Sequence, residues 1–362
     1  MKWLLDILKS LRPNFEEGGR LKPMKPLFDA AENFFFAPST RTGNFPHVRD
    51  PLDVKRFMSV VIIAILPCFV ASVYFFGLRI VPMIIVSYAV GGAVEVLFAV
   101  VRKEEINEGF LVTGFIFPLI LPPGLPLWMV AVGVAFGVLV GKELFGGTGR
   151  NLFNPALVGR CLLAIGYPAA MSANWIAPGD GLLGRITQYA DATTADAISQ
   201  ATPLVLAKQG TLTSLSSLFW GNVSGSVGET SAILIILGGL FLLFTRVANW
   251  RTVVGILGSF AILAGILHNI QPERFVSVPW HLCAGGLLFG AFFMATDPVT
   301  SPITNAGKWA YGIIIGVSTV LIRNLTGYVE GVMFAILLGN IAAPILDEVA
   351  LRGRLWRLKN EE

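Results

Sequence analysis

Long apolar stretches, separated by short polar intervals, dominate the sequence. Ten of them can be marked, and we expect each to form a helix: residues 57–77, 80–101, 110–122, 126–144, 152–171, 230–245, 252–268, 280–295, 309–323 and 331–347. A helix needs about 20 apolar residues to cross the hydrocarbon core of a bilayer, so several of the ten are short. The pattern predicts an all-α polytopic membrane protein with about ten transmembrane helices, some of them broken.

Proline-containing breaks end two of these stretches. The third ends in Leu121-Pro122-Pro123-Gly124, and the eighth runs into Thr296-Asp297-Pro298. Non-helical backbone is tolerated at membrane depth only where protein or a water-filled cavity covers it. We therefore predict broken or re-entrant helices at both places.

The two halves of the chain resemble each other. A shift of 175 residues places Pro123 on Pro298, Gly137 on Gly312 and Gly141 on Gly316, and matches the third stretch to the eighth. Because each half holds five stretches, the halves enter the membrane in opposite directions. We expect two inverted five-helix repeats, residues 57–171 and 230–347, whose broken helices form a site near the middle of the membrane.

The charge distribution sets the orientation. The sequence is 54% hydrophobic and 14% charged, whereas soluble domains carry about 25% charged residues. With a cytoplasmic N-terminus, 21 of the 27 Lys and Arg residues fall on the cytoplasmic side. This orientation explains the basic pI without a nucleic-acid partner. It predicts a cytoplasmic N-terminal segment (1–56), an outer, periplasmic loop (172–229) and a cytoplasmic tail (348–362).

The N-terminal segment carries no cleavable signal peptide. Its first residues place apolar side chains at helical spacing, at Trp3, Leu4, Ile7, Leu8 and Leu11. The spacing predicts an amphipathic helix that lies on membrane lipid or, alternatively, contacts a soluble partner. The three cysteines, Cys68, Cys161 and Cys283, are far apart and lie in apolar stretches, so we interpret them as small core residues rather than metal ligands.

A glycine-rich motif, FGGTGRNLFNPA, covers residues 145–156. It lacks the Lys-Ser/Thr pair of a phosphate-binding P-loop, and its Asn-Pro-Ala occurs once, whereas aquaporins carry it twice. It predicts a turn that leads into a helix, with Asn151 and Asn154 either facing a polar ligand or simply capping that helix.

Three acids lie within or beside the apolar stretches: Glu95, Asp297 and Asp347. Carboxylates at membrane depth are costly and commonly line an ion route, although Asp347 is near enough to the edge to be interfacial. Near Glu95, Gly91-Gly92 would allow a flat ligand or, more commonly, another helix to approach the backbone closely.

The stretch Asp196-Ala-Ile-Ser199-Gln-Ala201-Thr202 lies in the predicted outer loop. A Ser/Thr-rich loop is commonly solvated coil, and no neighbouring base activates Thr202 as a nucleophile. The pattern Asp-x-x-Ser-x-Ala-Thr nevertheless resembles the flavinylation motif of the NqrB subunit of the Na⁺-translocating NADH:quinone oxidoreductase and of the RnfD subunit of the Rnf complex. The usual motif has glycine where this chain has Gln200.

Further stretches carry the same resemblance along nearly the whole chain: HVRD (47–50), GGAVEVLFA, NEGFLVTG, KELFGGTGRNLFNPA, GNVSGSVGE, FFMATDPV and GKWAYGI. The HVRD stretch and the long N-terminal segment favour NqrB over RnfD. The chain is short for that family, which predicts trimmed loops between helices.

The resemblance implies a role for each matching position. A separate flavin transferase would esterify FMN to Thr202 within a motif containing Asp196, Ser199 and Ala201, with Gly225, Ser226 and Gly228 supporting the loop. Asn151 and Asn154 match positions associated with riboflavin, Gly91 and Gly92 match a quinone region, and Glu95, Asp297 and Asp347 match acids associated with Na⁺ uptake.

The implied protein is a subunit of a respiratory complex in the bacterial inner membrane. Electrons would pass from an outer-facing flavoprotein subunit through FMN and riboflavin to ubiquinone, coupled to Na⁺ translocation. Two alternatives remain at this point. One is the Rnf subunit, which shares the flavins but not the quinone; the other is an inverted-repeat transporter or channel without a cofactor.

Overall fold

The computed structural model describes residues 10–15, 25, 28, 54–103, 109–173, 175–176, 178 and 201–361. Every regular element within these ranges is helical, as the sequence predicts. The predicted amphipathic helix at the N-terminus falls almost wholly outside the described residues. Of its five predicted apolar residues only Leu11 is described; it is helical and exposed, and it directly precedes the short helix η1, Arg12–Asn14.

Helices coincide with all ten apolar stretches. They are α3 (Val54–Phe76), α4 (Ile80–Arg102), α5 (Gly109–Leu119), α6 (Leu127–Gly141), α7 (Pro155–Gly166), α12 (Ala232–Phe244), α13 (Trp250–Ile270), the interrupted α14 (Val278–Cys283), α15 (Leu287–Phe289) and η5 (Gly290–Met294), α16 (Asn305–Leu325) and α17 (Val332–Glu361). Five described stretches are long and apolar enough to cross a membrane: Phe57–Phe76, Ile80–Arg102, Leu127–Phe145, Trp250–Ile270 and Val332–Trp356. The protein is therefore an integral membrane protein by length and composition.

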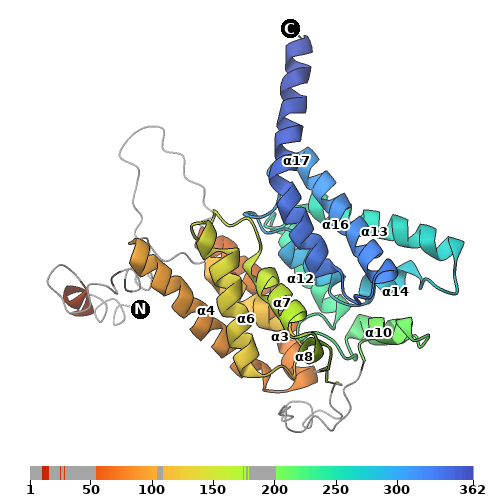
Figure 1. Ribbon diagram of the computed structural model, residues 1–362, viewed down its shortest axis with the longest axis horizontal. Coiled ribbons are helices and arrows are strands. Elements are labelled where there is room, and N and C mark those ends of the chain that lie inside the picture. The colour runs from red at the N-terminus through yellow and green to blue at the C-terminus, as the bar shows by residue number, and fades with distance from the viewer. Residues whose placement is uncertain are drawn as a thin grey trace.

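The helices form two neighbouring groups (Figure 1). In the first group α4 packs on α5 and α6, and α6 packs on α7; in the second group α13 packs on α16, and α16 packs on α17. Helices α3 and α12 join the groups, and a side chain at Gly238 of α12 would collide with the Ala64 carbonyl of α3. Small residues thus permit close approach between helices where lipid supplies no hydrophobic driving force.

The third helix is broken as predicted, and its break is covered by a distant segment. After α5 ends at Leu119, the Gly228 N–H donates to the Leu119 carbonyl (2.6 Å), and the Val227 N–H donates to the Leu121 carbonyl (3.0 Å). The sequence predicts residues 172–229 as a loop on the outer side of the membrane. Near its end, residues 223–231 are almost all buried, and the backbone of Val227 and Gly228 satisfies polar groups that the broken helix exposes.

The eighth helix is interrupted earlier than the proline pattern indicates. Helix α14 ends at Cys283, and the chain resumes as α15 at Leu287 after Gly285, whose φ of +67° is a left-handed conformation that favours glycine. A π-helix, η5, then precedes the predicted break at Thr296-Asp297-Pro298. A π-helical turn is uncommon and is frequently found at functional sites.

The last helix is longer than predicted. The apolar pattern ends at residue 347, but α17 continues to Glu361 and projects beyond the bundle (Figure 1). Glu348 and Arg352 form an ion pair of 2.6 Å one helical turn apart, which stabilises an exposed helix. Hydrophobicity therefore marks the end of the apolar stretch but not the end of the helix.

Candidate functional site

A large cavity opens beside Thr202, and we call it the Thr202 cavity. It has a volume of about 510 Å³ and is lined by residues of α7, α8 (Pro168–Ala173), α10 (Pro203–Lys208), α17 and the segments 223–230 and 327–330. This volume lies in the range of about 300–1,000 Å³ that small-molecule sites occupy. Trp175, Tyr328 and Phe334 contribute aromatic surface, which suits a flat ligand.

Thr202 lies immediately before α10 with an extended backbone. A threonine here commonly caps the helix through its side chain, but the Thr202 hydroxyl makes no capping bond and has no other hydrogen bond to a described residue. Pro203 occupies the first helical position, where its missing N–H costs nothing. Thr202 thus lines the Thr202 cavity with a hydroxyl that no described residue bonds.

Helix α10 is held in place by contacts near both of its ends. Leu204 is buried in a small apolar cluster with Leu218 and Trp280. At the other end the Lys208 ammonium donates to the carbonyls of Thr326 (3.0 Å) and Tyr328 (2.9 Å). Partial burial lowers the pKa of Lys208 from its ordinary value. These contacts hold the segment after Thr202 against the loop 326–331.

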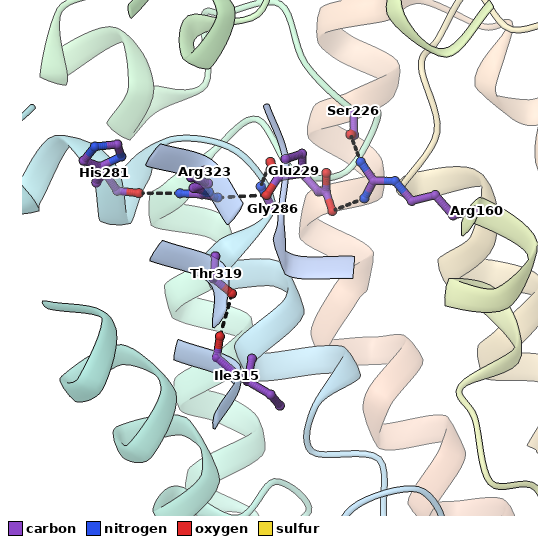
Figure 2. Close-up of polar contacts among 9 residues, drawn as sticks. Arg160, Ser226, Glu229, His281, Gly286, Ile315, Thr319 and Arg323 are labelled. Atoms are coloured by element: carbon purple, nitrogen blue, oxygen red, sulfur yellow. Dashed lines mark hydrogen bonds and ion pairs between the residues drawn. The ribbon is translucent and has the colours of Figure 1, made fainter. Parts of the chain in front are cut away.

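Four charged residues lie at or beside the Thr202 cavity, and we call them the Arg–Glu cluster: Arg160, Glu229, Arg323 and Glu330. Arg160, Glu229 and Glu330 line the cavity, and Arg323 is the partner of Glu330. Arg160, Glu229 and Arg323 are buried, whereas the Glu330 side chain is 22% exposed. Arg160 donates to Glu229 (3.2 Å) and to the Ser226 hydroxyl (3.4 Å). Arg323 donates to Glu330 (2.9 Å) and to the His281 carbonyl (3.0 Å), as Figure 2 shows in part. Two cations face two anions, so the cluster is neutral when all four groups are charged.

The interrupted helix provides the space for both carboxylates. The Gly286 N–H donates to Glu330 (3.0 Å), and a β-carbon at Gly286 would lie 2.5 Å from Glu229. A β-carbon at Gly285 would collide with Glu330. A side chain at either position would displace the carboxylate that it meets, and at Gly285 the φ of +67° independently favours glycine.

The two carboxylates differ in their electrostatic environment. Burial raises the pKa of Glu229 above its ordinary value, although Arg160 opposes the effect. Burial acts in the same direction on Glu330, but Arg323 and Arg160 outweigh it and lower the pKa of Glu330. The two arginines therefore stabilise the charged form of Glu330, whereas burial opposes the charged form of Glu229.

The sequence pattern assigns no role to this cluster. It marks Arg160 only as a basic residue within a span and Arg323 as one on the outer side, and it contains Glu229 only in the GSVGE stretch. The one available signal is Arg160 itself, because an arginine inside an apolar stretch needs a partner. Its partner is 69 positions away in sequence, and the helical pattern does not identify it.

A second, smaller cavity lies beside Asn154, and we call it the Asn154 cavity. Its volume is about 70 Å³, and its polar lining consists of Thr113, Lys142, Thr148, Asn151, Asn154, Thr296 and Asp297. Phe293 of the π-helix contributes to its apolar wall. The structure thus brings together three residues that the sequence singles out separately: Asn151, Asn154 and Asp297.

Asn154 caps helix α7, as one of the two interpretations of the sequence predicts. Its Oδ1 accepts from the backbone N–H of Ala156 (3.0 Å) and Leu157 (3.4 Å), and its own N–H donates to Asn340 (3.4 Å). Asn151 donates locally to the Phe153 carbonyl (3.1 Å). Asn154 Nδ2 and Asn151 Oδ1 have no hydrogen bond to a described residue, so each side chain retains a polar atom for a ligand.

The predicted acids have protein partners. Glu95 accepts a hydrogen bond from Lys142 (2.7 Å), and both side chains are almost fully buried. Asp297 closes a local turn by accepting from the Thr300 hydroxyl (2.9 Å). Asp347 accepts from the backbone N–H groups of Ile303 (2.8 Å) and Thr304 (2.9 Å), next to the start of α16.

The remaining predicted residues have different positions. Ala201, Gly225 and Ser226 line the Thr202 cavity, whereas Gly228 packs against Leu119. Gly91 lies against the Phe110 ring, in agreement with close helix packing, and Gly92 has more room. Asp196 and Ser199 lie outside the described residues.

Comparisons with known proteins give the family. The profile of the NQR2, RnfD, RnfE family matches residues 41–354. One relative is the Na(+)-translocating NADH-quinone reductase subunit designated B from Klebsiella pneumoniae (strain 342), which is 38% identical over 416 aligned positions, with 99% of each chain covered. The protein of the same name from Azotobacter vinelandii is 38% identical over 403 positions, with 97% of each covered.

A third relative of the same name, from Pseudoalteromonas atlantica, is 38% identical over 406 positions and 97% of each chain. All three alignments are longer than the 362 residues of this chain, so the relatives carry insertions, as the short loops of this sequence predict. Both the family match and these similarities extend over most of the sequence. The chain belongs to the NQR2, RnfD, RnfE family.

Proposed function

We propose that this chain is the membrane subunit of a Na⁺-translocating NADH:quinone reductase and carries FMN covalently on Thr202. The names of its full-length relatives support the enzyme class. The observation that carries the flavin assignment is the position of the Thr202 hydroxyl: without a hydrogen bond to a described residue, at the wall of a cavity of about 510 Å³ with aromatic surface. FMN, when bound, supplies the electron-carrying chemistry.

Attachment requires a donor that this chain does not contain. The Thr202 oxygen forms a bond to the flavin phosphorus, the hydroxyl proton is lost, and the bond from phosphorus to a leaving group breaks. A phosphate monoester has no adequate leaving group, so the donor is a flavin nucleotide with a phosphoanhydride, presented by a flavin transferase. No base in the described part of the chain bonds to the Thr202 hydroxyl, which agrees with catalysis by a separate enzyme.

The test is the intact mass, with peptide mapping, of protein co-expressed with a flavin transferase. We expect the Thr202 peptide to gain the mass of FMN less one water, and Thr202→Ala to abolish the gain. Thr211→Ala is the matched control, because Thr211 is an exposed threonine nine positions further along the same segment. Wild-type protein without an adduct would contradict the assignment and favour a transporter without a cofactor.

We propose that the Asn154 cavity contacts the polar edge of riboflavin. Its amide and hydroxyl groups suit the hydrogen-bonding atoms of a flavin ring. Its volume of about 70 Å³ is too small for a whole flavin, since sites for such ligands measure about 300 Å³ or more. A riboflavin held here would therefore lie partly outside this chain, against lipid or another subunit of the complex.

We propose that ten helices cross the bacterial inner membrane as two inverted repeats with both termini in the cytoplasm. Each group contains one interrupted helix. Three helices of each group also contact one another in the same order: α4 with α6 and α6 with α7, and α13 with α16 and α16 with α17. The matched glycines do not share equivalent neighbours, however: Gly137 lies against α7, whereas Gly312 lies against α13. Helix order rather than the glycine match supports the repeat.

The remaining roles follow from the family resemblance. We propose that electrons pass from an outer flavoprotein subunit towards ubiquinone near Gly91 and Gly92, and that Glu95, Asp297 and Asp347 contribute to the Na⁺ route. Glu95 Oε2 is buried without a hydrogen-bond partner among the described residues, so of the three acids Glu95 is the one with a carboxylate oxygen that no described donor satisfies. Sodium uptake by reconstituted Glu95→Gln complex tests this role, and uptake equal to wild type would contradict it.

A further inference from the structure

Arg160 is the only lysine or arginine among the described residues that line the Thr202 cavity. It extends from α7 towards Glu229 and Ser226 (Figure 2), and its side chain is 8% exposed. The same wall contains the carboxylates of Glu229 and Glu330. Any anion that enters the cavity therefore meets two negative charges and depends on this one cation.

The present contacts of Arg160 are long for a charged pair. Its guanidinium lies 3.2 Å from Glu229 and 3.4 Å from Ser226, whereas charge-assisted N–H···O bonds measure about 2.7–2.9 Å. A guanidinium has five N–H donors, and two of them bond to described residues here. Arg160 thus has further donors beside the cavity.

An FMN attached to Thr202 places a phosphodiester, which carries one negative charge, in this cavity. A buried anion without a partner is costly, and the planar guanidinium fork matches two oxygens of a phosphate. The segment after Thr202 also reaches the cluster, because Leu204, Arg323 and Glu330 all converge on the space beside Gly285. The chain around Thr202 and the Arg–Glu cluster are therefore neighbours.

We propose that Arg160 is a positioning residue that binds the flavin phosphodiester and fixes the flavin within the Thr202 cavity. The inference rests on the proposed attachment of FMN to Thr202. Arg160 would hold the free phosphate oxygens with the N–H donors that Glu229 and Ser226 do not use, while Glu229 stays paired. The aromatic side chains of the cavity then pack on a flavin ring whose phosphodiester link to Thr202 is fixed in place.

The test compares four variants of flavin-loaded protein: Arg160→Gln, Arg160→Lys, Glu229→Gln and Arg274→Gln. Peptide mass gives the fraction of Thr202 that carries flavin. Fluorescence anisotropy decay and quenching by acrylamide, which is uncharged, report how freely the attached flavin moves. Arg274 is the matched control, since it is an exposed arginine that does not line the Thr202 cavity.

We expect Arg160→Gln to increase the freely rotating fraction of the flavin roughly tenfold, the size of effect for one lost charge-assisted hydrogen bond. Glu229→Gln and Arg274→Gln should resemble wild type. Arg160→Lys keeps the charge but not the planar fork, so it should lie between wild type and Arg160→Gln. If Arg160→Gln reduces attachment itself, restoration by Arg160→Lys together with normal attachment in Glu229→Gln supports the same role.

Equal defects in Arg160→Gln and Glu229→Gln would overturn the inference, because both changes break the same ion pair and would reveal only a structural role. An Arg160→Gln flavin as immobile as in wild type would also overturn it, and so would a loss of attachment that lysine does not restore. A wild-type protein without any adduct would instead contradict the proposed attachment at Thr202.

Discussion

At the scale of single residues, the buried pair of Glu95 and Lys142 illustrates how a charge is accommodated in an apolar bundle. The two residues lie on α4 and just after α6, 2.7 Å apart and almost inaccessible to solvent. Removing two charges from water costs several kcal/mol per ion, and their mutual attraction offsets this cost only while both are present. The presence of the pair is therefore weak evidence for net stability, whereas the loss of one partner is costly.

We expect each single substitution, Glu95→Gln or Lys142→Met, to lower the free energy of unfolding by roughly 3–5 kcal/mol, because it leaves the remaining charge unpaired. The double variant should be less destabilised than either single variant. Thermal unfolding of the detergent-solubilised wild-type protein, both single variants and the double variant, monitored by circular dichroism, measures this double-mutant cycle. Glu348→Gln and Arg352→Met provide an exposed control pair, with effects of about 0.5 kcal/mol or less. Additive effects of the two buried substitutions would contradict the pairing.

At the scale of helices, Gly91 and Gly92 have different surroundings although they are adjacent in sequence. A β-carbon at Gly91 would lie 2.6 Å from the Phe110 ring and 2.9 Å from Val134, so it would collide with both α5 and α6. At Gly92 the nearest atom would be 3.4 Å away. One glycine is required by helix packing, and its neighbour is not.

Gly91→Ala should therefore lower stability by about 1–3 kcal/mol, the usual cost of overpacking. Gly92→Ala should be neutral or stabilising by up to about 1 kcal/mol, since alanine is the better helix former. Thermal unfolding in detergent measures both, and equal effects would contradict the packing described here. If Gly92→Ala changes quinone reduction without changing stability, a binding role at this position gains support.

The helices could be predicted from the sequence because apolar stretches and prolines are local signals. The interruption at Ala284–Gly286 could not be predicted from proline, because its cause is the pair Gly285–Gly286 and the carboxylates that lie against it. The burial of residues 223–231 could not be predicted either. The side chains of Ser226 and Glu229 bond to Arg160, and the backbone of Val227 and Gly228 bonds to the end of a broken helix far away in sequence. Motif resemblance identifies Thr202 and Asn154, but only tertiary structure relates them to Arg160 and Asn340.

At the scale of the whole molecule, two helices connect the two cavities. Helix α7 begins at the Asn154 cavity and carries Arg160 at the Thr202 cavity, about 9 Å further along its axis at 1.5 Å per residue. Helix α17 contributes Met333 and Phe334 to the Thr202 cavity, and its Asn340 bonds to the backbone of Asn154. A change at one cavity can therefore reach the other through two packed, rigid elements.

Asn340 joins the two groups of helices and is fully buried. It accepts from the Asn154 N–H (3.4 Å) and donates to the Thr300 carbonyl (3.2 Å) and the Tyr311 hydroxyl (3.0 Å). Asn340→Leu keeps a similar volume but leaves these groups without a partner, at about 1–3 kcal/mol for each unsatisfied group. We expect a large loss of thermal stability and faster amide hydrogen exchange at the start of α7.

Asn324→Leu is the matched control for this substitution, because Asn324 lies on α16 and its side chain bonds to the Val320 carbonyl of its own helix (3.0 Å). It should lower stability far less and leave exchange at α7 unchanged. Equal destabilisation by the two leucine substitutions, or unaltered exchange at α7 in Asn340→Leu, would contradict the view that Asn340 joins the halves. A selective effect at α7 would mean that the shape of the Asn154 cavity depends on Asn340, a residue of the other half. The reason is that Asn154, which caps α7, donates its backbone N–H to Asn340.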